Sequence, residues 1–386
     1  MPTTVNPTAL ITYLQQHQHE MFADLRRLVS AESPSSDPRT QARPQQLLRN
    51  TLDQLGYRTW LIPGQETGGH LLAEPRLTPS NQPKQMLLGH TDTVWPVGTL
   101  ATMPLTTEDN IMRGPGVYDM KAGLIQIIYA LKALHALNID LSVTPSLFIN
   151  SDEEIGSPES RAHIMRLAPN MNRALVAEPA LGPLGHLKTA RKGVGHFIIE
   201  THGQAAHAGL DPDKGVSAIL EMSHITQKLF TLNEPDNGVS VNVGVINGGM
   251  RSNVIAPHCT AEVDVRVLNQ ADADRLHNAI NALQPTLNGT QITIKGKFNR
   301  PPMERTDRNQ ALWHLAQQLG TEIGLDLDQA WAGGGSDGNL TSPYTATLDG
   351  LGPIGDGAHA AHEHIDLDHI IPRTALLALL IAAPPL

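Results

Sequence analysis

The chain has 386 residues, of which 40% are hydrophobic and 17% are charged, a composition typical of soluble globular proteins. Its formal net charge of −10 argues against a nucleic-acid partner, because no basic surface offsets the phosphate charge. One cysteine, Cys259, excludes an internal disulfide and zinc sites built from paired cysteines. Because the chain is longer than one hydrophobic core usually organises, we expect two domains.

Neither end of the sequence predicts a membrane or secretory segment. Residues 1–18 lack a basic region followed by an apolar run, so we expect no signal peptide. The last apolar stretch, residues 375–383, is too short to span a bilayer. We therefore expect a soluble, cytoplasmic protein.

The first half of the chain alternates predicted helices and strands. Apolar residues recur with a helical period over residues 8–29 and again over residues 121–137. Three short apolar runs, residues 85–90, 146–150 and 174–179, resemble strands that end in polar side chains. This alternation predicts an α/β sheet whose functional residues lie beyond the strand ends.

The pattern changes between residues 192 and 300. Half-exposed strands and helices follow one another in the order β-α-β-β-α-β, which predicts a split-βαβ, ferredoxin-like domain. Residues 310–386 return to longer helices and loops. We therefore predict a catalytic domain formed by residues 1–191 and 301–386, with residues 192–300 inserted as a second domain.

Five separated segments carry side chains that bind metals, at predicted strand ends or turns: residues 89–94, 114–121, 151–156, 177–179 and 358–363. Their histidines, aspartates and glutamates, without cysteine, match the nitrogen and oxygen ligands that zinc takes in catalytic sites. Two neighbouring metals need a bridging carboxylate and about two further protein ligands each. The segments supply enough ligands for such a dinuclear site.

In this order, the segments resemble the zinc aminoacylase/carboxypeptidase family, which includes acetylornithine deacetylase, succinyl-diaminopimelate desuccinylase and glutamate carboxypeptidase. The family pattern is His-x-Asp, a Gly-rich Asp-x-Lys, a Glu-Glu pair, a lone acidic residue and a late histidine. The match extends from Leu87 to Glu363. The resemblance implies a mixed-sheet zinc-peptidase catalytic domain (α/β) with an inserted α+β lid and dimerisation domain.

The resemblance also implies two Zn²⁺ ions per subunit, although Co²⁺ or Mn²⁺ can occupy sites of this kind. His90 and Glu178 would hold one metal. Glu154 and His359 would hold the other, and Asp119 would bridge the two.

The same resemblance assigns roles in the reaction. Asp92 would orient the metal-bound histidine beside it, and Glu153 would be the general base that takes a proton from the bridging water. His207 would reach the active site of the partner subunit and stabilise the oxyanion. Asn253 and Arg266 would bind the substrate's carboxylate end, a task that suits the planar guanidinium of arginine.

Three functions remain open at this point. Residues 114–117, 153–157 and 333–337 are most similar to the glutamate carboxypeptidase branch, so we predict release of a C-terminal amino acid from a peptide or N-acyl conjugate. The alternative is an N-acyl-amino-acid deacylase or a dipeptidase with the same chemistry. A non-catalytic member that only binds a peptide or an amino acid is less favoured, because the base and every ligand are present. The resemblance implies a homodimer.

Overall fold

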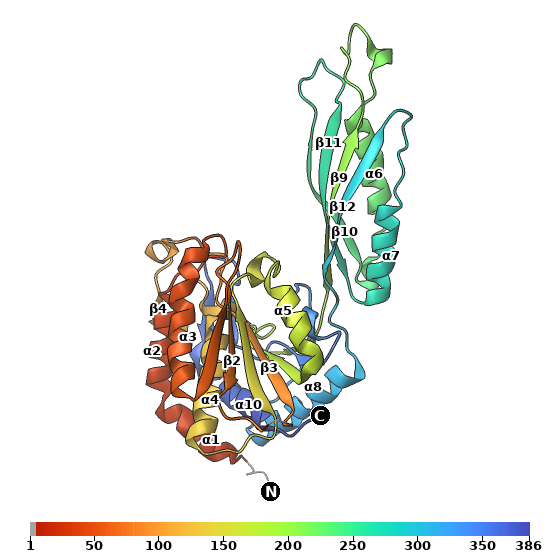
Figure 1. The fold of residues 1–386 in the computed structure, drawn as a ribbon. Helices are drawn as coiled ribbons and strands as arrows, with labels where there is room; N and C mark the ends of the chain where they lie inside the picture. Colours follow the sequence, from red (N-terminus) through yellow and green to blue (C-terminus); the bar gives the residue numbers. More distant parts are fainter. Residues whose placement is uncertain (1–4, 80) are drawn as a thin grey trace. The chain divides into compact units, whose positions relative to one another are not determined.

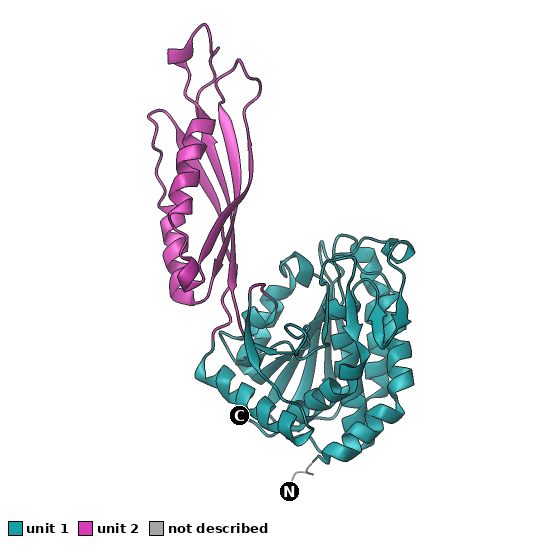
Figure 2. Cartoon of the chain, turned by 180° about the vertical axis from the view of Figure 1, so that it is seen from behind, with its two compact units in different colours: residues 1–189, 305–332, 336–386 teal, residues 190–304, 333–335 magenta. Residues whose placement is uncertain are grey.

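The computed structural model describes residues 5–79 and 81–386, so the first four residues of the segment 1–18, for which we expect no signal peptide, lie outside the described residues. The chain forms two compact units (Figure 2). Unit 1 comprises residues 1–189, 305–332 and 336–386. Unit 2 comprises residues 190–304 and 333–335.

Unit 1 is built on a six-stranded mixed sheet, visible in Figure 1. Its strands, in spatial order, are β1 (Tyr57–Ile62), β2 (His70–Pro75), β6 (Thr144–Asn150), β3 (Lys84–His90), β7 (Met171–Val176) and β14 (Ala346–Leu348). β3 runs parallel to β6 and β7, and β14 runs parallel to β7. Nearly every residue of β3, β6 and β7 is buried because both faces of the sheet are covered.

The two faces of this sheet pack against different helices. On one face, Leu87 and its neighbours contact helices drawn from both ends of the chain: α1 (Pro7–Gln16), α2 (Gln18–Val29), α3 (Ala42–Gln54), α4 (Ala122–Ala136), α8 (Asp307–Glu322) and α10 (Ile370–Ala382). On the other face, Met86 and Leu88 contact α5 (Ser160–Leu167) and α9 (Gly338–Thr341). The alternation of β3 side chains therefore supplies two separate cores.

The helix predicted over residues 8–29 is two helices, with a break at His17. Asn6 caps α1 by accepting hydrogen bonds from the backbone of Thr8 and Ala9. At His17 the backbone leaves helical geometry (φ −101°, ψ 9°), and the ring nitrogen Nδ1 lies 2.8 Å from the carbonyl oxygen of Tyr13. The apolar period continues across this break, so periodicity alone did not reveal it.

Two small sheets complete unit 1. One has the order β15 (Gly355–Asp356), β16 (His364–Asp366), β5 (Ile111–Arg113) and β4 (Thr106–Glu108). The other pairs β8 (Leu187–Arg191), of which residues 187–189 belong to unit 1, with β13 (Gln329–Ala332). Because β16 pairs with β5, the late segment 357–363 lies beside the segment 114–121.

Unit 2 is an antiparallel sheet with helices on one face. The strand order is β10 (Ser240–Gly248), β11 (His258–Val267), β9 (Gly193–His202) and β12 (Gln291–Arg300). Helices α6 (Ala218–Phe230) and α7 (Gln270–Asn281) cover the face that carries Phe197, Ile199 and Val263. The predicted fold class, an α/β catalytic domain with an α+β insertion, is confirmed. Within residues 5–79 and 81–386, no helix combines the length and the apolar character needed to cross a bilayer.

Candidate metal centre

Three predicted ligands meet at the carboxyl ends of parallel strands in unit 1. His90 is the last residue of β3, and Glu178 lies two residues beyond the end of β7. The Nε2 atom of His90 lies 3.2 Å from Oδ1 of Asp119 and 3.5 Å from Oε1 of Glu178. One potential ligand atom from each of these three residues lies within 4.8 Å of the others.

Two glycines set the backbone around Glu178. A Cβ atom on Gly123, in the first turn of α4, would lie 1.8 Å from the carbonyl oxygen of Ala177. A Cβ atom on Gly352 would lie 2.2 Å from the same oxygen, and the Gly352 amide donates to the carbonyl of Glu178 at 2.8 Å. Only glycine allows this close approach, so Gly123 and Gly352 together fix the position of the backbone from which the Glu178 side chain extends.

A second group forms around the other predicted ligands. Glu154 lies in the short turn η4 (Glu153–Ile155) that follows β6, and His359 lies in the segment that β16 and β5 bring alongside. The Nε2 atom of His359 lies 3.0 Å from Oε2 of Glu154 and 3.6 Å from Oδ2 of Asp119. His359 adopts the left-handed backbone region (φ 61°), which is uncommon for a residue other than glycine.

Asp119 belongs to both groups. Its Oδ1 atom faces His90, whereas its Oδ2 atom faces His359. Asp119 lies in the irregular turn η3 (Val117–Lys121), which leads into α4. One carboxylate therefore lies between two sets of nitrogen and oxygen donors.

Asp92 lies behind the first group and is fully buried. Its carboxylate accepts hydrogen bonds from the Ser35 hydroxyl (2.6 Å) and from the backbone amides of Glu153 (3.3 Å) and Glu154 (3.1 Å). The Nδ1 atom of His90 lies 2.9 Å from the Asp92 carbonyl oxygen and 3.4 Å from Oδ1. These acceptors favour a proton on Nδ1, which leaves the Nε2 lone pair of a neutral ring facing the other ligands.

The carboxylates and imidazoles shift one another's pKa. Burial disfavours the charged ring of His90, but the carboxylates of Asp119, Asp92 and Glu178 raise its pKa well above the usual value. Contacts with Asp119 and Glu154 raise the pKa of His359 to about 10. Protonated histidines thus balance the carboxylates in the metal-free protein, and a cation would take over that role.

Glu363 is a further residue of this site, and the sequence predicts no role for it. Its buried carboxylate accepts hydrogen bonds from the amides of Gly116 (2.8 Å), Tyr118 (2.9 Å) and Asp119 (3.1 Å), and from Nε1 of Trp95 (2.6 Å). It therefore fixes the turn that presents the shared carboxylate. The only signal in the sequence is an acidic residue four positions after His359.

Two of the three predicted residues of unit 2 lie on adjoining segments. The ring nitrogen Nδ1 of His207, which is exposed, accepts hydrogen bonds from the amides of Gly209 and Leu210, each at 3.1 Å. The amide of Ala208 donates to the carbonyl of Asn253 at 3.0 Å. The segments that carry His207 and Asn253 are therefore joined.

Arg266 lies elsewhere in unit 2. It is eight residues beyond His258 on β11, which corresponds to about 26 Å along an extended strand. Its Nε and Nη2 atoms donate to the carboxylate of Asp264 at 2.8 and 2.9 Å. A single copy of unit 2 does not bring Arg266 beside His207 and Asn253.

The comparison with known proteins decides the family. The model of peptidase family M20/M25/M40 matches residues 86–383, which include all five candidate ligands. The chain belongs to this family. Carboxypeptidase G2 of Pseudomonas sp. (strain RS-16) is 26% identical over 376 residues, covering 94% of this chain and 89% of that protein.

Two further comparisons agree with membership of the M20/M25/M40 family. Acetylornithine deacetylase of Proteus mirabilis (strain HI4320) is 33% identical over 370 residues, covering 87% of this chain and 88% of that protein. The crystal structure of aminopeptidase PepT from Bacillus cereus ATCC 10987 has a TM-score of 0.76 at 21% identity, covering 95% of this chain and 98% of that chain. The predicted family resemblance is confirmed, and the chain is a metallopeptidase or amidohydrolase of this family.

Proposed function

We propose that the protein is a dinuclear-zinc hydrolase that cleaves the amide bond of a C-terminal amino acid, as a glutamate carboxypeptidase does. The observation that carries this proposal is the position of Asp119, whose two carboxylate oxygens face two different donor groups. Each group adds one histidine and one glutamate. This is the ligand set that two neighbouring zinc ions require.

The donors fit zinc in chemistry as well as in number. Both histidines present Nε2 toward carboxylate oxygens, and the acceptors behind His90 favour the tautomer that a metal needs. Two zinc ions held there would polarise the scissile carbonyl and lower the pKa of a water molecule. Co²⁺ or Mn²⁺ would fit the same donors.

Glu153 is the proposed general base. It adjoins Glu154 in the turn η4, and hydrogen bonds from the backbone amides of both residues to Asp92 fix that turn. Glu153 would take a proton from the attacking water and later pass it to the leaving amine. Adjacent positions can hold these separate roles because neighbouring side chains diverge.

His207 is the proposed donor to the oxyanion. Because its Nδ1 atom accepts two backbone hydrogen bonds, a neutral ring carries its proton on Nε2, where it can donate. In the proposed homodimer this donor reaches the partner subunit's active site. Asn253 and Arg266 would bind the substrate carboxylate, for which Arg266 would exchange or share its contact with Asp264.

The second candidate is a deacylase of N-acyl amino acids, which the 33% identity to acetylornithine deacetylase favours, or a dipeptidase. Both candidates share the chemistry, so only the substrate separates them. The substrates proposed are small peptides or N-acyl amino acids. We further propose a cytoplasmic location, in keeping with a single cysteine that needs no oxidising compartment.

The test combines a substrate panel with two adjacent variants. Zinc-loaded wild type is assayed on N-acetyl amino acids, dipeptides, and folyl- or benzoyl-glutamate, beside Glu153→Ala and Glu154→Ala. We expect Glu153→Ala to keep its zinc and to lose about 10²- to 10⁴-fold in rate. We expect Glu154→Ala to lose zinc as well. If Glu153→Ala matches wild type, the base is misassigned. If fully loaded wild type cleaves nothing on a broadened panel, the proposed activity is wrong.

A further inference from the structure

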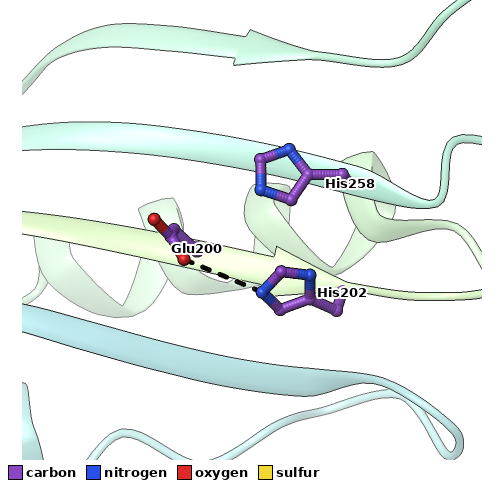
Figure 3. Close-up of side chains that lie close together, drawn as sticks. All are labelled: Glu200, His202 and His258. Atoms are coloured by element: carbon purple, nitrogen blue, oxygen red, sulfur yellow. Dashed lines mark ion pairs between the residues drawn. The ribbon is translucent and has the colours of Figure 1, made fainter.

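A third group of metal-binding side chains lies in unit 2, on the sheet face opposite the helices (Figure 3). It comprises Glu200 and His202 of β9 and His258 of β11. One potential ligand atom from each residue lies within 4.8 Å of the others. Of the three such groups within residues 5–79 and 81–386, this one shares no residue with the site in unit 1.

The strands place these side chains together. Glu200 and His202 are two residues apart on β9, so both point to the same face of the sheet. His202 and His258 are direct partners in the antiparallel pairing of β9 with β11, and their ring centroids are 5.0 Å apart. The intervening Thr201 and the following Cys259 are fully buried on the helix side. The backbone that carries all three side chains is therefore held by the core.

We propose that Glu200, His202 and His258 bind a divalent transition-metal ion of the zinc class, with a fourth position open to water. Two imidazole nitrogens and one carboxylate oxygen form a donor set that zinc accepts. Oε2 of Glu200 already lies 3.8 Å from Nε2 of His202. Zinc–ligand bonds of about 2.0–2.1 Å set neighbouring ligands about 3.3 Å apart in a tetrahedron. Rotation of these side chains closes the remaining gap without moving the strands.

Two neighbouring polar groups compete only weakly with such an ion. The Nζ atom of Lys295 lies 3.4 Å from Oε1 of Glu200, whereas the other oxygen, Oε2, faces His202. The hydroxyl of Thr260 lies 3.5 Å from Nε2 of His258. Exposed contacts of this kind contribute little energy. The positive charge of Lys295 nevertheless lowers the affinity for a cation, so this site binds zinc more weakly than the site in unit 1.

The position of the group suggests what a bound ion does. His202 immediately precedes residues 203–209, which carry His207, and His258 immediately follows residues 253–257, which begin at Asn253. The amide of Gly203 donates to the carbonyl of Pro257 at 2.8 Å, so both segments leave the sheet at this end. An ion that joins β9 to β11 restrains the start of both. This consequence rests on the proposed function, whereas binding of the ion does not.

The experiment uses the full chain, stripped with a chelator and titrated with zinc by calorimetry. A background carrying His90→Ala and His359→Ala silences the ligand groups of unit 1. We expect one remaining equivalent of zinc to bind per chain. His202→Ala and His258→Ala should each lower its affinity by at least about tenfold, which is the smallest loss typical even of removing a residue that only supports a metal ligand. On the otherwise unaltered chain, His202→Ala should lower the total stoichiometry by one.

The chain offers a matched control in His196. It lies on the same face of β9, 3.7 Å from Glu262 of β11, and within residues 5–79 and 81–386 these two belong to no group of three potential ligand residues. His196→Ala should leave the remaining equivalent unchanged, and Glu200→Gln, which preserves size, should weaken it. The proposal is overturned if the silenced background binds no zinc, or if His196→Ala weakens binding as much as His258→Ala. Loss of hydrolysis on the substrate panel would instead contradict the proposed function, and these titrations would be unaffected.

Discussion

Both units carry histidines and carboxylates on neighbouring strands, yet the two arrangements differ in what stands behind them. In unit 1, Asp92 and Glu363 are buried and saturated with hydrogen bonds, and they hold the residues that face the centre. In unit 2, the neighbours of Glu200 and His258 are the exposed Lys295 and the half-buried Thr260. Buried carboxylates require a compensating charge, whereas water screens exposed ones. The buried carboxylates that support the ligands therefore distinguish the two clusters. The cluster in unit 1 requires positive charge, whereas the cluster of Glu200, His202 and His258 in unit 2 can bind an ion but is stable without one.

Asp119→Ala gives the largest expected effect, because it removes the one carboxylate that both groups in unit 1 share. We expect zinc at both groups to be lost, and all measurable hydrolysis with it. Metal analysis after gel filtration, together with the substrate assay, checks this. Asp140→Ala, which changes an exposed aspartate of the same unit, should behave as wild type. A variant that retains two ions at this site would contradict the bridging role.

His207→Ala tests the role of unit 2 in catalysis. We expect unit 2 to contribute to the rate of hydrolysis but not to the binding of the catalytic metals. Loss of one oxyanion donor should lower kcat about 10²- to 10³-fold, with zinc content at unit 1 unchanged. His224→Ala, on helix α6 of the same unit, is the matched control. If His207→Ala lowers the zinc content in proportion to the rate, the assignment of metal binding to unit 1 and of oxyanion stabilisation to unit 2 is wrong.

The sequence predicted the parts of the site that follow from strand ends. The runs that became β3, β6 and β7 each end in polar residues, and parallel strands place those ends at one edge of the sheet. The role of Glu363 could not be predicted, because its partners include the backbone amides of Gly116, Tyr118 and Asp119, which leave no trace in side-chain identity. The break at His17 was missed because the apolar period continues through it.

In unit 2 as well, the sequence predicted the fold but not which side chains contact one another. Strand alternation predicted its fold, and the same alternation places Asp264 and Arg266 on one face, where they pair. The predicted role of Arg266 in binding substrate gave no indication of this contact with Asp264, and that role stays a prediction. The pairing of His202 with His258 depends on the register of two strands separated by more than fifty residues, which periodicity does not determine.

Glu363→Gln tests whether the metal ligands of unit 1 depend on the buried carboxylate that supports them. The amide keeps the size of the side chain but loses one acceptor oxygen and the negative charge, so a buried amide donor is left unpaired. We expect a loss of about 1–3 kcal/mol in the free energy of unfolding of the metal-free chain. We also expect about 10- to 100-fold lower zinc affinity. Denaturant unfolding and zinc titration measure the two effects, and exposed Glu66→Gln is the control. Unchanged zinc affinity would show that the turn around Asp119 needs no such support.

The smallest expected effect is on the pH dependence of zinc uptake by unit 1. Because Asp119 and Glu154 raise the pKa of His359 to about 10, this ring stays protonated in the metal-free chain between about pH 7 and 9. Zinc needs the Nε2 lone pair, so binding must displace that proton. Affinity should therefore rise about tenfold per pH unit for each displaced proton, and fall as the pH falls. Calorimetry in two buffers with different ionisation enthalpies counts the protons, and His359→Gln should reduce the count. If zinc binding releases no proton, the charge balance inferred between the histidines and carboxylates of unit 1 is wrong. The ligand groups of unit 1 would then differ from the cluster of Glu200, His202 and His258 in unit 2 only in how deeply they are buried.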